Sequence, residues 1–160
     1  MQKSNLEYKD IVFDAKPEAV PFNYRISYKV TQLCLIMQLC GRGNICSLIK
    51  LHMISYALIS KQNMDKLMEF IEKDIEMPII RFDTSVNRAL TYAVAYGLIE
   101  QLQTGKYKLT SKGHNIAEKI KQEGDIMVAE ICSLNTLSKK LTETMIDKIV
   151  EAWRTSDVEN

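Results

Sequence analysis

The sequence contains few of the residues that carry out catalysis or bind metals. Its 160 residues include two histidines and four cysteines, with neither a Cys-x-x-Cys pair nor a histidine at zinc-binding spacing. His52 and His114 lie in different predicted helices, and neither has a nearby Ser or Cys with a third orienting group in a known signature. We therefore expect no enzymatic activity, no catalytic residue, no bound metal, no cofactor and no small-molecule substrate.

The cysteines are predicted to be buried thiols: Cys34, Cys40, Cys46 and Cys132. The apolar neighbours of Cys34 and Cys132 favour core packing over reactivity. His52, which also lies in an apolar stretch, is expected to be structural, whereas His114 is expected on the exposed side of its helix.

Long apolar runs are also lacking, and no secretory leader is expected. No run approaches the roughly 20 residues that span a bilayer, and the closest, residues 33–37, stops at Gln38. The N-terminal residues MQKSNLEYKD lack the apolar core of a signal peptide. We expect a cytoplasmic protein without a membrane partner.

The sequence has no large excess of either positive or negative charge, because the net charge is +1. Residues 104–123 carry five basic and two acidic side chains, whereas residues 124–160 carry four basic and seven acidic ones. A protein that binds DNA alone usually has many Lys and Arg side chains on one face, since counterion release from phosphates supplies much of the affinity. The composition is not typical of such a binder.

What the sequence does contain is helical periodicity. Apolar residues at spacings of three and four predict helices over about residues 24–40, 47–59 and 63–75, the second capped by Ser47. Residues 41–44, between the first two helices, read as a turn, because a phosphate-binding loop would need a following Lys-Ser or Lys-Thr and a preceding strand. Residues 79–82, after Pro78, are compatible with a short strand.

A further helix is predicted from Asp83 or Thr84, either of which can cap it, to Gly97. Its expected buried side consists of Val86, Ala89, Leu90, Ala93 and Val94. Its expected exposed side consists of Ser85, Asn87, Arg88, Thr91, Tyr92 and Ala95. Arg88 is the one positive charge on that exposed side.

A short β-hairpin follows this helix. Residues 98–102 and 107–110 have strand character and flank a Thr104-Gly105 turn. A helix capped by Thr110 or Ser111 should come next, with Ile116 and Ile120 on its apolar side. Helix, strand, turn, strand and helix follow one another as in a winged helix, in which the first of these helices enters the DNA major groove in DNA-binding members.

The expected fold is therefore mainly α with a small β-hairpin, a winged helix-turn-helix with additional terminal segments. Residues 1–20 form an N-terminal arm, residues 21–123 the winged-helix domain, and residues 124–160 a C-terminal helical extension. Candidate contacts to a DNA backbone are Arg88, Lys106, Lys108 and Lys112. Lys106 and Lys108, two apart on one predicted strand, should point to the same face.

Both terminal segments are candidate partner-binding surfaces. The arm carries Tyr8, Ile11 and Phe13, which are too apolar for a purely solvated tail, and the last predicted helix carries a stripe that includes Met145, Ile149 and Trp153. Thr142 is the expected cap of that helix. The C-terminal pair of helices either packs back on the domain or forms a docking surface, and the sequence leaves both alternatives open.

Two stretches resemble the middle component of the bacterial ABC-three-component defence systems, which include the Lamassu type. They are PFNYRISYKVTQLCLIMQLCGRGNICSLIKLHMISYAL and PIIRFDTSVNRALTYAVAYGLIEQLQTGKYKLTSKGHNIAEKI, within about residues 21–120. The most specific pieces are the Gly-Arg-Gly turn before Ser47-Leu48 and the path from Arg81-Phe82-Asp83 to Gly97-Leu98-Ile99. The hairpin pattern alone occurs in many winged-helix regulators.

The resemblance implies a small non-enzymatic subunit that joins an SMC- or Rad50-like ATPase to a variable effector, often a nuclease, in defence against phage or plasmids. DNA contact would then be weak, non-specific and made through the complex. The alternative is a winged-helix transcription regulator, which would need a dimer because one recognition helix reads only a few base pairs.

Overall fold

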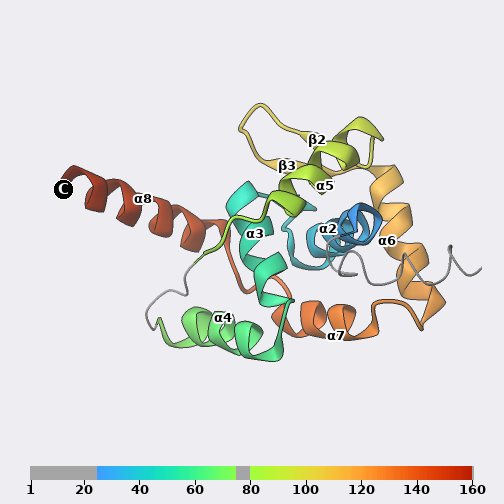
Figure 1. Cartoon of the computed structure of the whole chain (residues 1–160), viewed down its shortest axis with the longest axis horizontal. Coiled ribbons are helices and arrows are strands. Elements are labelled where there is room, and N and C mark those ends of the chain that lie inside the picture. Colours follow the sequence, from blue (N-terminus) through green and yellow to red (C-terminus); the bar gives the residue numbers. More distant parts are fainter. Residues whose placement is uncertain (1–24, 75–79, 160) are drawn as a thin grey trace, which may run out of the picture.

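The computed structural model describes residues 25–74 and 80–159, which form a mainly helical structure with one small antiparallel sheet (Figure 1). The helices are α2 (Ile26–Cys40), α3 (Leu48–Ala57), α4 (Lys61–Lys73), α5 (Thr84–Ala95), α6 (Ser111–Glu123), α7 (Val128–Leu137) and α8 (Glu143–Glu159). The strands are β1 (Ile45–Cys46), β2 (Ile99–Gln101) and β3 (Tyr107–Leu109). Within the described ranges, no helix has both the length and the apolarity that a membrane span requires.

Helix α2 lies at the centre of the core. Residues 33–37 are all fully buried, and five consecutive apolar side chains point in every direction around a helix, so α2 needs cover on all sides. Helices α3, α5, α6 and α7 all pack against it, and Figure 1 shows it in their midst. The helix predicted from the sequence is confirmed over the described part of its range, although its burial extends well beyond one face.

Helix α3 begins at the predicted cap. The Ser47 side chain accepts a hydrogen bond from the backbone N–H of Lys50 at 3.2 Å. The helix is buried on most sides, and the buried residues include the polar Lys50, His52 and Ser55. Lys50 Nζ donates to the carbonyl of Cys40 at 2.8 Å, which places a cation at the C-terminus of α2, where the helix dipole favours it.

The turn between α2 and α3 is confirmed, and it leads into a strand that the sequence did not indicate. Gly41 is required by close approach, since a Cβ there would lie 2.6 Å from the Met37 carbonyl oxygen. Gly43 and Asn44 both have a positive φ, which reverses the chain into β1. A strand of two residues is too short to give an alternating pattern, so the expected hairpin becomes a three-stranded sheet.

The sheet has the order β1-β3-β2, and both pairings are antiparallel. The predicted hairpin is confirmed, with Ile99 opposite Leu109 and Glu100 opposite Lys108. Ile99 and Leu109 are buried. Because side chains alternate along a strand, Glu100 and Lys108 lie on the opposite, outward face of the sheet.

The segment before α5 corrects one prediction. Residues 80–83 form neither helix nor strand, and the Phe82 ring packs edge-on against His52, with ring centroids 4.9 Å apart. A strand here would need a free sheet edge, and this segment lies instead against α3 through His52. Residues 75–79, including the predicted end of the third helix and Ile79, lie outside the described residues.

Helices α7 and α8 share the core of the domain. Leu134, Leu137, Leu141 and Ile146 are buried in the same apolar cluster as α2, and the Tyr28 hydroxyl of α2 donates to the Glu130 carboxylate of α7. Thr142 caps α8 as predicted, accepting from the N–H of Met145 at 3.2 Å. The packing-back alternative therefore holds for α7 and for the start of α8, while the end of α8 extends away from the other helices (Figure 1).

The first prediction concerns Gly113, which holds α6 against the hairpin. A Cβ at this position would lie 2.2 Å from the Leu98 carbonyl oxygen and 2.6 Å from Leu109 Cδ1. In an uncrowded helix, Gly→Ala stabilises by roughly 0.4–1 kcal/mol. Here we expect Gly113→Ala to destabilise by about 1–3 kcal/mol, the usual cost of overpacking, measured by urea unfolding.

Asn115→Ala is the matched control, because Asn115 is exposed on the same helix. It should leave the free energy of unfolding nearly unchanged or raise it slightly. An increase in stability for Gly113→Ala would contradict the close approach of α6 to Leu98.

Candidate functional site

The outer face of α5 is the first candidate surface, and its helix begins as predicted. The Asp83 carboxylate accepts a hydrogen bond from the Ser85 N–H at 2.8 Å. The expected buried side is correct except for Val94, which is exposed. Ala93 packs against the core, and Val94, one position further along the helix, therefore points toward the solvent beside the hairpin. On the expected exposed side, Ser85 is half-buried, and the others are exposed.

Two stacked tyrosines dominate this outer face. The rings of Tyr92 and Tyr96, one helical turn apart, are nearly parallel, with centroids 6.2 Å apart and an interplanar angle of 20°. They are 44% and 63% exposed. Arg88 precedes Tyr92 by one turn, so the stripe reads Arg, Tyr, Tyr. Tyr92 and Arg88 are on the exposed side expected from the sequence, whereas Tyr96 was not expected there, although its i, i+4 spacing from Tyr92 indicates it.

A shallow hollow of about 320 Å³ lies beside the stripe, between α5, the start of α3 and the hairpin. Apolar and uncharged polar side chains line it, namely Leu48, Asn87, Leu90, Thr91, Val94, Gln101 and Tyr107. None of these side chains is charged. The surface next to the tyrosines can therefore contact a partner through apolar side chains and hydrogen bonds, without a strong electrostatic potential.

The structure disperses the hairpin lysines that were predicted as phosphate contacts. Lys108 is exposed on the outward sheet face, in register with Glu100 on the neighbouring strand, and opposite charges at such a cross-strand position favour each other. Lys106 is half-buried and precedes β3, so strand alternation does not fix its face. Lys112 donates from Nζ to the carbonyl of Tyr96 at 3.0 Å, at the C-terminus of α5. Together with Arg88, these cations do not form a compact basic patch.

The predicted stripe on α8 divides between the core and a groove. Ile149 is buried, whereas Met145 and Trp153 are half-buried. All three line an open groove of about 410 Å³ between α4 and α8, together with Phe70, Ile71, Asp74, Lys148 and Ala152. Tyr8, Ile11 and Phe13 lie outside the described residues, so the arm stays a prediction.

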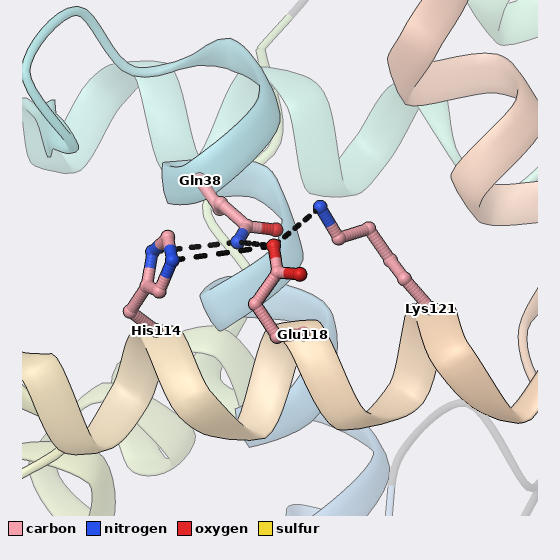
Figure 2. Close-up of polar contacts among 4 residues, drawn as sticks. All are labelled: Gln38, His114, Glu118 and Lys121. Atoms are coloured by element: carbon pink, nitrogen blue, oxygen red, sulfur yellow. Dashed lines mark hydrogen bonds and ion pairs between the residues drawn. The ribbon is translucent and has the colours of Figure 1, made fainter.

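Figure 2 shows a polar cluster that joins α2 to α6. Gln38 Nε2 donates to Glu118 Oε1 at 2.6 Å, and Lys121 Nζ lies 2.7 Å from the same oxygen. The hydrogen bond from Lys121 is the largest cause that lowers the pKa of Glu118, and the hydrogen bond from Gln38 is the next largest. His114, predicted on the exposed side of its helix, is half-buried, and its Nε2 lies 4.0 Å from this carboxylate. The four groups lie across a helix interface, and no nucleophile is among them, so we assign the cluster a structural role. Within the described residues, the Gln38 Oε1 atom is buried and has no hydrogen-bond partner.

The cysteines and His52 also have structural environments. Burial raises the pKa values of the Cys34, Cys40 and Cys46 thiols to about 12, so these thiols stay protonated and unreactive. Cys132 is exposed on α7, which corrects the prediction that all four cysteines are buried. On this helix Ser133 is half-buried, and Leu134, rather than Cys132, packs in the core. Among residues 25–74 and 80–159, no cluster of three or more His, Cys, Asp or Glu side chains can hold a metal ion.

No protein-family model matches the chain, and neither a curated protein nor a solved structure matches it.

The second prediction follows from the dispersed cations. The isolated chain should bind duplex DNA weakly and without sequence preference, with a slope of log affinity against log salt near about −3 if Lys106, Lys108 and Lys112 each meet a phosphate. Replacing all three by Glu should remove this residual binding, measured by fluorescence anisotropy across a salt series.

The matched control places three glutamates at exposed lysines away from the hairpin, Lys66, Lys139 and Lys140. This variant keeps the same net charge as the hairpin variant, and its binding should fall much less. Tight and sequence-specific binding by the isolated chain would favour the transcription regulator.

Proposed function

We propose that the chain is a cytoplasmic, non-enzymatic subunit that joins an SMC- or Rad50-like ATPase to an effector protein, often a nuclease, in a bacterial defence complex. The resemblance of residues 21–120 suggests this class. The observation that carries the proposal is the outer face of α5, where two stacked and exposed tyrosines accompany a single cation, Arg88.

The proposal treats the domain as a winged helix. The order α2, β1, α3, α5, β2 and β3, with the sheet order β1-β3-β2, supports this assignment. Helix α5 then holds the position that enters the major groove in DNA-binding members, and α4 is an additional helix between α3 and α5. Helices α7 and α8, predicted as a C-terminal extension, share the core of this unit, and the predicted arm, residues 1–20, lies outside the described residues.

The chemistry of α5 favours a protein partner over DNA. Tyr and Arg are enriched in the buried centres of protein interfaces, where an aromatic ring supplies apolar area and a polar edge at small entropic cost. A helix that binds phosphates needs several cations. Few lie near α5, and one of them, Lys108, is in register with the acidic Glu100. We infer that this helix faces a protein in the complex.

The groove between α4 and α8 is the second proposed contact. Met145 and Trp153 keep part of their apolar surface open there, beside Phe70 and Ile71. Two separate surfaces, on α5 and on α8, suit a subunit that joins two partners. DNA contact through Arg88 and the hairpin lysines would then occur only when the assembled ATPase holds duplex nearby.

The third prediction tests the α8 contact in the assembled complex. The chain is co-expressed with an SMC-like ATPase encoded beside it, and complex formation is measured by light scattering and by titration of purified components. Truncating a buried interface aromatic commonly costs about 2 kcal/mol or more, so Trp153→Ala should weaken the complex roughly thirtyfold or abolish it.

Val158→Ala is the matched control, because Val158 is exposed on the same helix and lies outside the groove. It should leave the affinity unchanged. If Trp153→Ala and deletion of residues 1–20 both leave the complex intact, the proposed α8 and arm surfaces are wrong. If no ATPase is encoded beside the gene and none binds, the proposed function itself fails.

A further inference from the structure

A small pocket lies between α3 and the segment that leads into α5, away from the groove and from the tyrosine stripe. Its volume is about 290 Å³, just below the range of roughly 300–1,000 Å³ for small-molecule sites. The lining residues come from α3 and its C-terminus and from residues 81–84: His52, Ser55, Tyr56, Ile59, Arg81, Phe82, Asp83 and Thr84.

The floor of the pocket rests on a buried lysine. Ser55 and Lys29 are each 2% exposed. Lys29 Nζ donates to Ser55 Oγ at 3.1 Å and to Gln32 Oε1 at 3.4 Å, and both acceptors are neutral. Among the described residues, no carboxylate forms a hydrogen bond or ion pair with Lys29. A buried ammonium without a bonded counter-ion is costly, and burial lowers the pKa of Lys29 accordingly, while the charge of Asp83 opposes that shift.

The mouth of the pocket combines a cation with apolar surface. Arg81 is exposed and makes no hydrogen bond or ion pair within the part of the chain that the structure describes. Phe82 is 55% exposed, and Ile59 is exposed on the other side of the mouth. An arginine fork without a partner, beside an exposed ring, suits a planar carboxylate attached to an apolar body.

His52 forms a fixed wall of the pocket. Its Nδ1 accepts from the Asp83 N–H at 3.2 Å, which places the ring proton on Nε2, and Nε2 donates to Asn87 Oδ1 at 2.9 Å. Both nitrogens are therefore occupied. Burial lowers the pKa of His52, so the ring is neutral, and Phe82 packs edge-on against it. The wall offers an aromatic surface and no free proton donor.

We propose that this pocket binds a small aromatic carboxylic acid. The ring lies against Phe82 and Ile59, and the carboxylate accepts hydrogen bonds from the Ser55 hydroxyl and from Arg81. The Ser55 hydroxyl now donates to Gln32 Oε1 at 3.2 Å and can rotate toward the ligand, while Gln32 keeps its bond from Lys29. A carboxylate bonded to Ser55 lies within about 6 Å of the Lys29 ammonium and becomes its counter-ion.

The charges of the pocket are consistent with a single negative charge on the ligand. Lys29 and Arg81 are positive, and the one acid that lines the pocket, Asp83, already accepts the Ser85 N–H as the cap of α5. One positive charge remains in excess, and a monoanion neutralises it. The inference does not depend on the proposed function, because the ligand would contact α3 and residues 81–84 rather than the outer face of α5 or the groove.

The experiment titrates the full chain with sodium benzoate by isothermal calorimetry and by amide chemical shifts. Benzamide serves as the uncharged analogue. We expect one saturable site with a dissociation constant on the order of 1 mM. Benzamide should bind at least tenfold more weakly, because it lacks the charge-assisted hydrogen bonds. The largest shifts should fall at Ser55 and Phe82.

Variants separate this pocket from adventitious binding. Arg81→Ala should weaken benzoate binding roughly tenfold, whereas Arg42→Ala, at an exposed arginine outside the pocket, should leave it unchanged. Lys29→Met replaces the buried ammonium by an apolar side chain of similar length and should also weaken binding. Because Arg81 is exposed, its variant keeps the test valid even if Lys29→Met does not fold.

Three results would overturn the proposal. Benzoate that does not saturate by about 10 mM is one, and equal effects of Arg81→Ala and Arg42→Ala are the second. The third is an acetyl-Phe-Glu-amide dipeptide that binds more than tenfold more tightly than benzoate, which would assign the pocket to side chains of a partner protein. Benzoate binding at least as tightly as the dipeptide supports a free acid. Loss of benzoate binding with an intact ATPase complex would leave the proposed function standing.

Discussion

Residues 33–37 of α2 must be covered on every side, and the arrangement of the other helices follows from this requirement. Each of these side chains is fully buried, and burial stabilises the fold by about 25 cal/mol per Å² of apolar area removed from water. Helices α3, α5, α6 and α7 each present an apolar side to α2. Once these sides are used, the outer face of α5 and the open side of α8 stay exposed, and these are the surfaces that we propose for partners.

The same burial places polar groups in unusual positions. Lys29 and Lys50 lie on the two most buried helices, and each reaches an acceptor: Lys50 binds the terminal carbonyl of α2, and Lys29 binds Ser55. The first arrangement closes a helix end and needs nothing more. The second leaves a charge with neutral partners beneath a pocket. Lys50 is fully paired, whereas Lys29 has only neutral partners. For this reason we propose a ligand for the pocket above Lys29.

Local signals in the sequence were sufficient for much of the fold, since the caps Ser47, Asp83, Thr110 and Thr142 all act where helices were expected to begin. The hairpin was predictable because Gly105 and its flanking strands are a local pattern. Strand β1 was not, because its pairing with β3 joins residues that are far apart in the chain. The exposure of Cys132 and Val94 depends on the rotation of a helix by a single position, which short apolar stretches do not determine.

The candidate site was predictable in composition but not in arrangement. The lysines of the hairpin are evident in the sequence, whereas the pairing of Lys108 with Glu100 requires the register of the sheet. The stacking of Tyr92 on Tyr96 could be inferred from helical spacing, yet their exposure depends on how α5 packs on α2. The pocket beneath Arg81 was not predictable, because Lys29, Ser55 and Arg81 come from three separate segments.

The most direct test is amide hydrogen exchange of the chain, alone and in complex with the proposed SMC- or Rad50-like ATPase. A protein-joining subunit predicts slower exchange over the second half of α5, around Tyr92 and Tyr96, and over α8 in the complex. Exchange in α2, already buried, should stay unchanged. The contrary result is unchanged exchange in α5 and α8 in the complex, together with protection of α5 and the hairpin when duplex DNA is added to the chain alone.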